Sequence, residues 1–394
     1  MNPRAAHVDR YGLIYALLIY VVSRAIVMTA ALLAPLHTAN REPGLFWVDP
    51  PTIRWDAGHY RYILMFGYPP QPSDTTAFFP AYPLVTWPLA KLTGRPDLSL
   101  VIVSHVCGAG AIAFFYLWAR RRADADLALR AVALVCSYPP AMFFSTGYSE
   151  GLFLLCVAAA LYFLEREWFW RAALTSALAT GTRPTGIVIA AIVMLYFLTS
   201  HRAIAWPRRL TRAAALGFAS LAGILAHEAF LWRYYGRADA YFAAQESWKP
   251  KERPDYWRRV VTLKPVLQPA LEPIKGLARA DFAALKNPAT WNQFWNVSLL
   301  TIAICGLVGP GRWPRVPFLI PILMFLMGYL ADPAGGARLV GIARYQLAAL
   351  PCFAWLAGVR GLRGGLIPIG LLCAALMLLQ VRYVQLFCDW VLVS

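Results

Sequence analysis

Residues 54–94, RWDAGHYRYILMFGYPPQPSDTTAFFPAYPLVTWPLAKLTG, decide how the fold of this chain is interpreted. The stretch follows the first long hydrophobic run and mixes ionisable and aromatic side chains with prolines. Four ionisable side chains crowd into its first half, which excludes a membrane span there: Arg54, Asp56, His59 and Arg61. Residues 77–92 are apolar, but they are short and are interrupted by prolines. The stretch therefore predicts two short helices lying at a membrane surface.

Asp56 falls near the first turn of the earlier of these two helices. A carboxylate there is stabilised by the free N–H groups and by the helix dipole, so we expect it to stay ionised. An ionised carboxylate at the boundary between water and lipid can serve as a general base for an amphiphilic substrate. Asp is also a common helix cap, and for Asp56 taken alone that role is the simpler interpretation. Its surroundings favour the catalytic role.

The composition predicts a helical protein that crosses a membrane many times. Hydrophobic residues make up 59% of the 394 residues and charged residues 14%, and the mean hydropathy is +0.51. Long apolar runs recur along the chain. The net charge of +17 comes from basic residues dispersed at the ends of these runs, a pattern typical of cytoplasmic loops. We therefore expect membrane lipids as partners and no nucleic acid.

Cysteine and histidine usage gives no sign of a bound cofactor. The seven cysteines lie mostly inside apolar runs without metal-ligand spacing, so we interpret them as packing residues. No nucleotide-binding loop of the G-x-x-x-x-G-K type is present in the sequence. His59 and Asp56 could form a metal-binding pair, but a single His is more often a hydrogen-bonded partner. A cofactor is thus not required, and a divalent metal is compatible with the sequence but not indicated.

The first two predicted spans set the topology. Residues 11–36 are long enough to cross with some tilt, and the short basic stretch before them is expected inside. Arg24 lies within this span and is expected to point into the bundle, because an intramembrane Arg is costly without a partner or cavity. Residues 98–118 lead into the arginines 120–122, which belong on the cytoplasmic side. Residues 37–97 are then a first outer loop that carries the catalytic residue.

Two breaks are expected in the middle of the chain. Residues 127–137 are short for a span, which predicts a broken helix lining a cavity, and the next helix opens at residues 148–150. Residues 172–199 are interrupted by the sequence TGTRPTG. A hairpin of two half-helices that bends at Arg183, near the outer face, keeps the basic residues 201–212 inside, as the charge rule requires.

The rest of the chain is expected to cross outward at 213–232, form a second outer loop at 233–291 and add four spans. Those spans are residues 294–308, 318–330, 346–357 and 366–379. Residues 1–394 are thus expected to form a single all-α, polytopic membrane domain. It has about eleven transmembrane segments, an inside N-terminus and an outside C-terminus.

This topology gathers polar and aromatic residues at the outer face. Beside Asp56, we assign a substrate-binding role to the following residues: Arg54, Trp55, His59, Tyr148, Glu150, Arg183, Gln245, Trp248, Lys249, Arg338, Arg344 and Tyr345. Carboxylates beside several fixed cations suit a substrate that carries phosphate on a lipid.

Plainer roles remain open for several of these residues. Arg338 and Arg344 could be snorkelling anchors at the interface. Tyr148 and Glu150 could simply begin a helix. Trp248 most simply belongs to an interfacial aromatic belt, together with Trp291 and Trp295. Arg183 is the exception, because a charge in a helix break within the membrane has no stabilising purpose without a partner.

The ordered motifs resemble a known family. RWDAGHY, followed by FGY and AFFPAYPL, looks like the first-loop signature of the GPI mannosyltransferase 2 (PIG-V) family. The resemblance continues through SYPPAMFFSTGYSE at 137–150, TRPTG at 182–186, YYGRADAYFAAQESW at 234–248 and ARYQLAALPCFAWLA at 343–357. It covers nearly the whole chain in the family's order. More loosely, the layout resembles the wider GT-C class of integral-membrane glycosyltransferases.

The resemblance implies a mannosyltransferase that moves mannose from a dolichol- or polyprenyl-phosphate carrier to an acceptor hydroxyl on the outer face. The GT-C class places a catalytic Asp in the first outer loop, and the matching position is Asp56. In eukaryotes the acceptor is a GPI precursor. This chain is rich in Ala and Arg, like a protein of a GC-rich bacterium, and does not match the family's eukaryotic C-terminal pattern. We therefore expect a bacterial cytoplasmic membrane, a site on its periplasmic or extracellular face, and a lipid, glycan or protein acceptor.

The expected mechanism is a single inverting displacement. Asp56 accepts the proton of the acceptor hydroxyl while that oxygen attacks the anomeric carbon. Polyprenyl phosphate leaves, and its growing charge needs a cation. Arg344 is the first candidate for this cation, followed by Arg338, Lys249 and Arg183.

A transporter or flippase of a lipid-linked sugar is the alternative function. Broken helices and intramembrane arginines suit a transporter equally well. The sequence shows no internal repeat, however, and its charged cluster is confined to one face, whereas alternating access needs gates on both. A non-catalytic scaffold leaves Asp56 and its neighbours without a purpose.

The topology predicts the accessibility of engineered cysteines. Single cysteines at Ser73 and Asp255 should react with an impermeant maleimide in intact cells, whereas one at Ala123 should react only after permeabilisation. Protection at position 73 combined with free labelling at position 123 would invert the topology.

Overall fold

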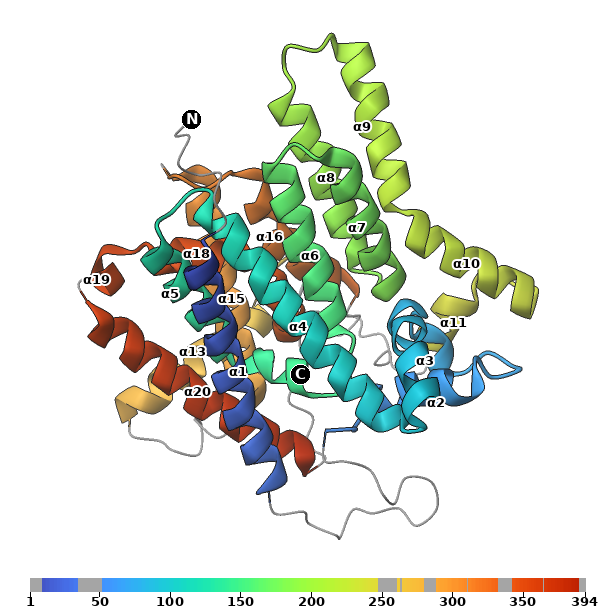
Figure 1. Ribbon diagram of the computed structural model, residues 1–394, viewed down its shortest axis with the longest axis horizontal. Coiled ribbons are helices and arrows are strands. Elements are labelled where there is room, and N and C mark those ends of the chain that lie inside the picture. The colour runs from blue at the N-terminus through green and yellow to red at the C-terminus, as the bar shows by residue number, and fades with distance from the viewer. Residues whose placement is uncertain are drawn as a thin grey trace.

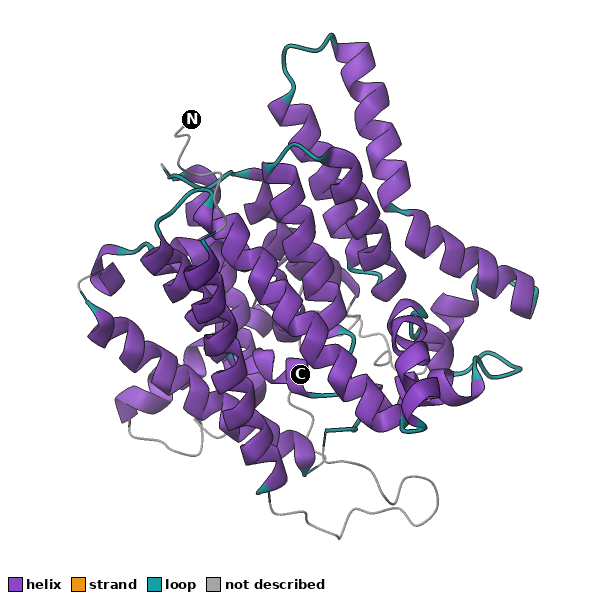
Figure 2. Ribbon diagram, in the orientation of Figure 1, coloured by secondary structure: helices purple, strands orange, loops and turns teal. Residues whose placement is uncertain are grey.

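The computed structural model describes residues 9–34, 52–246, 261–262, 264–279, 288–309, 311–331, 342–363 and 365–389. Every regular element within these ranges is a helix (Figure 2). The all-α class expected from the composition is therefore confirmed. The predicted residues Trp248, Lys249, Asp255 and Arg338 lie outside the described ranges.

Four helices of the described chain are long and apolar enough to cross a membrane, judged by length and composition. They are α1 (Arg10–Leu32), α4 (Pro96–Arg120), α15 (Pro288–Val308) and α20 (Leu366–Cys388). Two bent helix pairs raise the number to six if each pair counts as one span. The expected total of about eleven segments stays a prediction.

The first loop forms short helices, as predicted. Helix α2 (Asp56–Phe66) and helix α3 (Ala81–Thr93) are joined through a 3₁₀ turn, η3 (Asp74–Ala77), and lie at the lower end of α4 (Figure 1). The buried Tyr82 donates a hydrogen bond to the carbonyl of Leu100 at 2.7 Å, which fastens α3 to α4.

The opposite end of α4 carries the arginines 120–122, and Arg122 pairs there with Glu165. At a rise of 1.5 Å per residue, the 25 residues of α4 separate its two ends by about 37 Å. The first loop and the arginine triplet thus lie at opposite ends of the bundle (Figure 1).

The first expected break lies after α5 (Ala125–Ser137). The chain turns by 79° into a 3₁₀ helix, η4 (Pro139–Ser145), because two consecutive prolines cannot continue the α-helical hydrogen bonding. Helix α6 (Glu150–Glu165) follows.

Arg24 of α1 stabilises this break. Its side chain is 3% exposed, and its guanidinium donates to the carbonyl oxygens of Ala141 and of Cys136, the latter at 2.8 Å. It also donates to the side-chain carbonyl of Gln380 on α20 at 3.0 Å. The expectation that Arg24 points into the bundle is confirmed.

The expected hairpin is present as α7 (Phe169–Thr182) and α8 (Gly186–Ser200), which break at Arg183. The backbone of Arg183 is extended, with φ −157° and ψ 148°, and Pro184 follows it. Gly186 lets the two half-helices meet closely, because an added Cβ there would lie 2.5 Å from the backbone nitrogen of Thr180.

The next segment differs from the expected single crossing at 213–232. Helix α9 (Trp206–Ser220) begins inside the basic stretch that was expected to be loop, and a bend of 51° separates it from α10 (Ala222–Tyr235). The bend follows from contacts with α7. The hydroxyl of Thr180 on α7 donates a hydrogen bond to the backbone carbonyl of Ser220 at 3.0 Å. The helices also come very close at Gly223, where an added Cβ would lie 2.0 Å from the carbonyl oxygen of Ala177.

The remaining elements also differ in detail from the expected spans. Residues 346–357 are not one helix, because a 3₁₀ turn, η6 (Gln346–Ala348), precedes the short α18 (Leu350–Ala357). Helix α20 runs nine residues beyond the expected end at 379. The other elements are α11 (Ala240–Glu246), α13 (Lys264–Arg279), η5 (Val316–Phe318), α16 (Leu319–Ala331), α17 (Ile342–Tyr345) and α19 (Arg360–Arg363).

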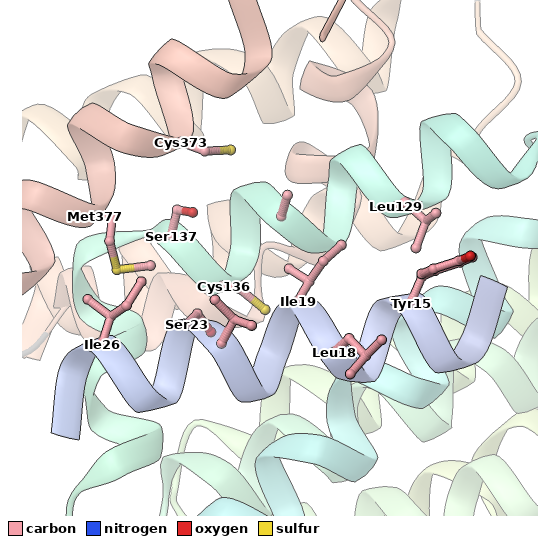
Figure 3. A pocket seen from close by; sticks show the side chains of 12 residues that line it. Tyr15, Leu18, Ile19, Ser23, Ile26, Leu129, Cys136, Ser137, Cys373 and Met377 are labelled. Carbon is pink, nitrogen blue, oxygen red and sulfur yellow. The ribbon is translucent and has the colours of Figure 1, made fainter. Parts of the chain in front are cut away.

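A hollow of about 520 Å³ separates α1, α5 and α20 (Figure 3). Apolar side chains such as Ile19, Leu129 and Met377 line it, together with the thiols of Cys136 and Cys373. Its lining is almost entirely apolar, which agrees with the interpretation of the cysteines as packing residues.

The close crossing of α7 and α10 predicts the effect of a single methyl group. Gly223→Ala should lower the free energy of unfolding by about 1–3 kcal/mol, because the helices must separate to accommodate the Cβ. Thermal unfolding of the purified protein in detergent measures this change. Gly370→Ala on α20 is the control, since nothing lies within 4 Å of its added Cβ. Equal midpoints for the two variants would contradict the crossing.

Candidate functional site

Asp56 is the first residue of α2, in the position the sequence predicts. The residue before it, Trp55, has φ +52°, a conformation that is costly for a bulky side chain. The backbone N–H of Asp56 donates to the hydroxyl of Tyr148 at 3.3 Å. Strained backbone persists where its surroundings hold it, and the contact with Tyr148 anchors the start of α2 just after this residue.

Arg344 joins Asp56 to a second carboxylate. Its Nη1 donates to Oδ2 of Asp56 at 2.8 Å, although 288 residues separate the two in the chain. Its Nε lies 2.9 Å from Oε1 of Glu150, an ion pair without hydrogen-bond alignment. The side chains of Arg344 and Glu150 are 8% and 4% exposed, whereas that of Asp56 is 28% exposed. Of the two acids, only Asp56 is open to a substrate.

Arg183 completes the cluster from the helix break. Its guanidinium pairs with the same oxygen of Glu150, Oε1, and its side chain is 8% exposed. The guanidinium also lies 4.7 Å from the centre of the Tyr345 ring. We call Asp56, Glu150, Arg183 and Arg344 the charged cluster. Two carboxylates and two guanidinium groups balance its formal charge, which is what makes their burial affordable.

Aromatic rings enclose the Arg344 guanidinium. The ring centres of Phe143, Tyr148 and Tyr345 lie 5.3–5.4 Å from it. Burial by itself would lower the pKa of Arg344, but the carboxylates of Asp56 and Glu150 raise that pKa well above its ordinary value. Arg344 is thus a permanent cation in a low-dielectric setting, where its interactions with anions are strong.

Other predicted residues lie in the first loop but make local contacts. His59 Nδ1 lies 3.0 Å from the hydroxyl of Thr75, and its ring stacks on Phe78 at 4.3 Å between centroids. Burial lowers the pKa of His59, against the pull of Asp56 and Asp74. Neutral His59 therefore links helix α2 to the turn η3.

Arg54 and Gln245 show no contact with the charged cluster among the interactions described. Arg54 donates to the carbonyl of Ile53 at 3.0 Å. Gln245 donates to the hydroxyl of Tyr241 at 2.6 Å. Trp291 and Trp295 stack on each other with ring centroids 5.8 Å apart, within the bundle packing of α15.

Tyr60 is a site residue that the sequence reasoning did not single out. Its hydroxyl lies 2.8 Å from that of Ser149, the residue that precedes Glu150, and its ring is buried. The spacing offered a signal, because Tyr60 is four residues after Asp56 and so shares its helix face. Among the described residues, Oε2 of Glu150 is buried without a hydrogen-bond partner.

No group of three or more His, Cys, Asp or Glu side chains in the described chain is arranged to hold a metal ion. The charged cluster alternates acids with arginines, and arginine is not a metal ligand. The expectation that no metal is required stays a prediction.

Comparison with known proteins points to one family. The protein-family model described as Mannosyltransferase (PIG-V) matches residues 13–248, more than half of the chain. Human GPI alpha-1,6-mannosyltransferase 2 is 33% identical over 152 residues, which cover 36% of this chain and 30% of the human protein. The mouse protein of the same name is 34% identical over 146 residues, covering 34% and 29%. The match therefore spans less than a third of each relative.

A solved structure shares the fold. The apo oligosaccharyltransferase of Archaeoglobus fulgidus aligns with a TM-score of 0.51 and 15% identity, over 96% of this chain and 56% of that one. ArnT from Cupriavidus metallidurans, bound to undecaprenyl phosphate, aligns with a TM-score of 0.43 and 16% identity, over 94% and 77%. At 15% identity, the first likeness concerns the fold alone, and it agrees with the expected GT-C type of bundle.

Proposed function

Since the match over residues 13–248 shows that the chain belongs to the PIG-V mannosyltransferase family, we propose that it is an integral-membrane glycosyltransferase. It moves mannose from a polyprenyl-phosphate carrier to a hydroxyl group of an acceptor, with inversion at the anomeric carbon. Asp56 is the general base. The observation that carries this proposal is the ion pair between the accessible Asp56 and the buried Arg344.

The different exposure of the two acids supports the choice of base. A general base must come within hydrogen-bond reach of the proton that it removes. Asp56 keeps 28% of its side chain exposed, whereas Glu150 is 4% exposed and lies between two guanidinium groups. Glu150 is therefore a positioning residue, which holds Arg344 and Arg183 at fixed places.

The positions of Asp56 and Arg344 suit a single displacement at the anomeric carbon. The acceptor oxygen forms a bond to the anomeric carbon while its proton passes to Asp56. The bond from the anomeric carbon to the phosphate oxygen breaks, and both its electrons stay on polyprenyl phosphate. Arg344 stabilises the charge that develops on this phosphate, and as a planar fork it can contact phosphate and carboxylate oxygens together.

Arg183 has a supporting role in this mechanism. It neutralises Glu150 and leaves Arg344 free to share its charge between Asp56 and the donor phosphate. The ring of Tyr345 lies against both arginines, at 4.7 and 5.4 Å from their guanidinium carbons. A hydrophobic wall of this kind excludes water and strengthens the local electrostatic interactions.

The distribution of charge supports an active site on the outer face. The charged cluster lies at the end of the bundle that carries α2 and α3, whereas the arginine triplet 120–122 lies at the other end of α4. Basic ends face the cytoplasm by the positive-inside rule. The substrates are accordingly a lipid-linked sugar and an acceptor on the periplasmic or extracellular side of a bacterial cytoplasmic membrane.

Asp56→Asn tests the general base. The substitution keeps the shape of the side chain and removes its basic oxygen, so turnover should fall by about a hundredfold to ten-thousandfold. Transfer from radiolabelled polyprenyl-phosphate-mannose to candidate acceptor lipids measures it in purified protein. Asp97→Asn is a matched control, because Asp97 also lies in a first helical turn and pairs with an arginine, Arg61, at 3.0 Å. Near-normal transfer by Asp56→Asn would leave Asp56 with a structural role only, as an ion-pair partner of Arg344 at the start of α2.

Arg344→Ala should act on donor binding as well as on chemistry. Loss of the cation removes a charge-assisted contact with the donor phosphate, so KM for the donor should rise while kcat falls. It also leaves Glu150 with one guanidinium partner instead of two. Steady-state kinetics at varied donor concentration separates the two effects, and Arg344→Lys should recover part of the loss. An unchanged donor KM would contradict a contact between Arg344 and the phosphate.

A further inference from the structure

A second hollow of about 550 Å³ lies between the first-loop helices α2 and α3 and the membrane helices α7 and α10. Its walls are apolar, with Ile63 and Leu64 from α2, Trp87 from α3 and Leu178 from α7. Its volume falls within the roughly 300–1,000 Å³ of typical ligand sites. We call it the α2–α10 groove.

One polar side chain lines the α2–α10 groove without a partner. His227 of α10 is 1% exposed, and neither Nδ1 nor Nε2 has a hydrogen-bond partner among the described residues. Its ring packs against Phe79, 4.3 Å away between centroids, and against Tyr68. Because buried polar groups in proteins are nearly always hydrogen-bonded, this ring calls for a partner that the described chain does not supply, such as a ligand atom or an ordered water.

The pocket between α1, α5 and α20 does not call for a hydrogen-bonding ligand in the same way. Ser23 lines this pocket (Figure 3). Its hydroxyl already donates to the carbonyl of Tyr20 at 2.7 Å. The remaining lining there is almost wholly apolar. An ordinary lipid chain satisfies that surface, whereas the α2–α10 groove also needs a hydrogen-bonding atom beside its apolar walls.

The α2–α10 groove shares helices α2 and α7 with residues of the charged cluster or next to it. Ile63 and Leu64 lie seven and eight residues after Asp56 on the same helix, a rise of roughly 11 Å. On the other wall, Gly181 lies two residues before Arg183. A ligand whose chain fills the groove can therefore place its head group near Asp56.

We propose that the α2–α10 groove binds an acyl chain of the acceptor, a glycolipid, and that His227 donates a hydrogen bond to the acyl carbonyl oxygen. This inference rests on the proposed function, which makes a lipid with a free sugar hydroxyl a substrate. The donor's polyprenyl chain is a hydrocarbon that offers His227 no carbonyl, so it fits the groove less well than an ester-linked acyl chain. His227 thus selects acyl lipids over alkyl lipids.

Binding of two synthetic lipids tests the proposal. The probes are dimyristoylglycerol glucoside and its dialkyl ether counterpart, each added to the detergent-purified protein at known mole fractions. The rise of the unfolding midpoint with lipid content gives the relative affinity. The ester lipid should bind about tenfold more tightly than the ether lipid, the effect of one hydrogen bond to a buried donor. His227→Phe keeps the ring packing against Phe79 and should abolish this preference.

His201→Phe is the matched control. His201 also stacks on a phenylalanine, Phe197 at 4.7 Å, but lies after α8 and does not line the groove. It should keep the tenfold preference. A preference for the ester lipid that survives in His227→Phe overturns the proposal. So does the absence of that preference from the unaltered protein, a comparison of the two lipids that needs no variant to fold.

A photoreactive ester lipid identifies the occupant. With a diazirine on its acyl chain, it should label Leu84 or Trp87, two lining residues of α3, and excess unlabelled ester lipid should prevent this. Prevention by polyprenyl phosphate instead would assign the groove to the donor and overturn the proposal. Neither measurement requires sugar transfer, so an inactive but selective protein would contradict the proposed function and leave this site intact.

Discussion

A guanidinium group taken out of water needs compensating negative charge, and Arg344 finds it in two places at once. Asp56 comes from the start of the first-loop helix and Glu150 from the start of α6. Arg183, in the break between two half-helices, balances the second acid. Removing one of the buried members, Glu150, Arg183 or Arg344, leaves a buried charge poorly compensated, which costs several kcal/mol. Four distant parts of the chain are thereby held at a single point.

Three of these four residues fall within the stretch that matches the PIG-V family, and Arg344 falls outside it. The family assignment inferred from RWDAGHY is confirmed, but the match ends at residue 248 and does not reach the motif at 343–357, which carries the cation that contacts Asp56. Only the fold brings Arg344 there, through the short helix α17. The site is therefore better defined by its charge balance than by its similarity to relatives.

The sequence predicted the location of charges better than the path of the helices. Hydropathy and the positive-inside rule located Asp56, Glu150, Arg183 and Arg344 at one end, because both report the cost of moving charge into lipid. Hydropathy and the positive-inside rule carry no information on contacts between backbones. The bend before α10 depends on such a contact, the close approach of Gly223 to α7, and so it was not predicted. The strained backbone at Trp55 could not be predicted either, because surrounding packing enforces it.

The contacts of Arg24 bear on the order in which the protein assembles during synthesis. Helix α1 is synthesised before the other described helices, yet its guanidinium depends on carbonyls at the end of α5 and on Gln380 of α20, 356 residues later. Chains emerge at about 5–20 residues per second, so Arg24 spends tens of seconds without its final partner. During that interval the charge needs water or another protein beside it. Water at the bilayer surface or the insertion machinery must therefore shelter this charge until α5 and then α20 supply its final partners.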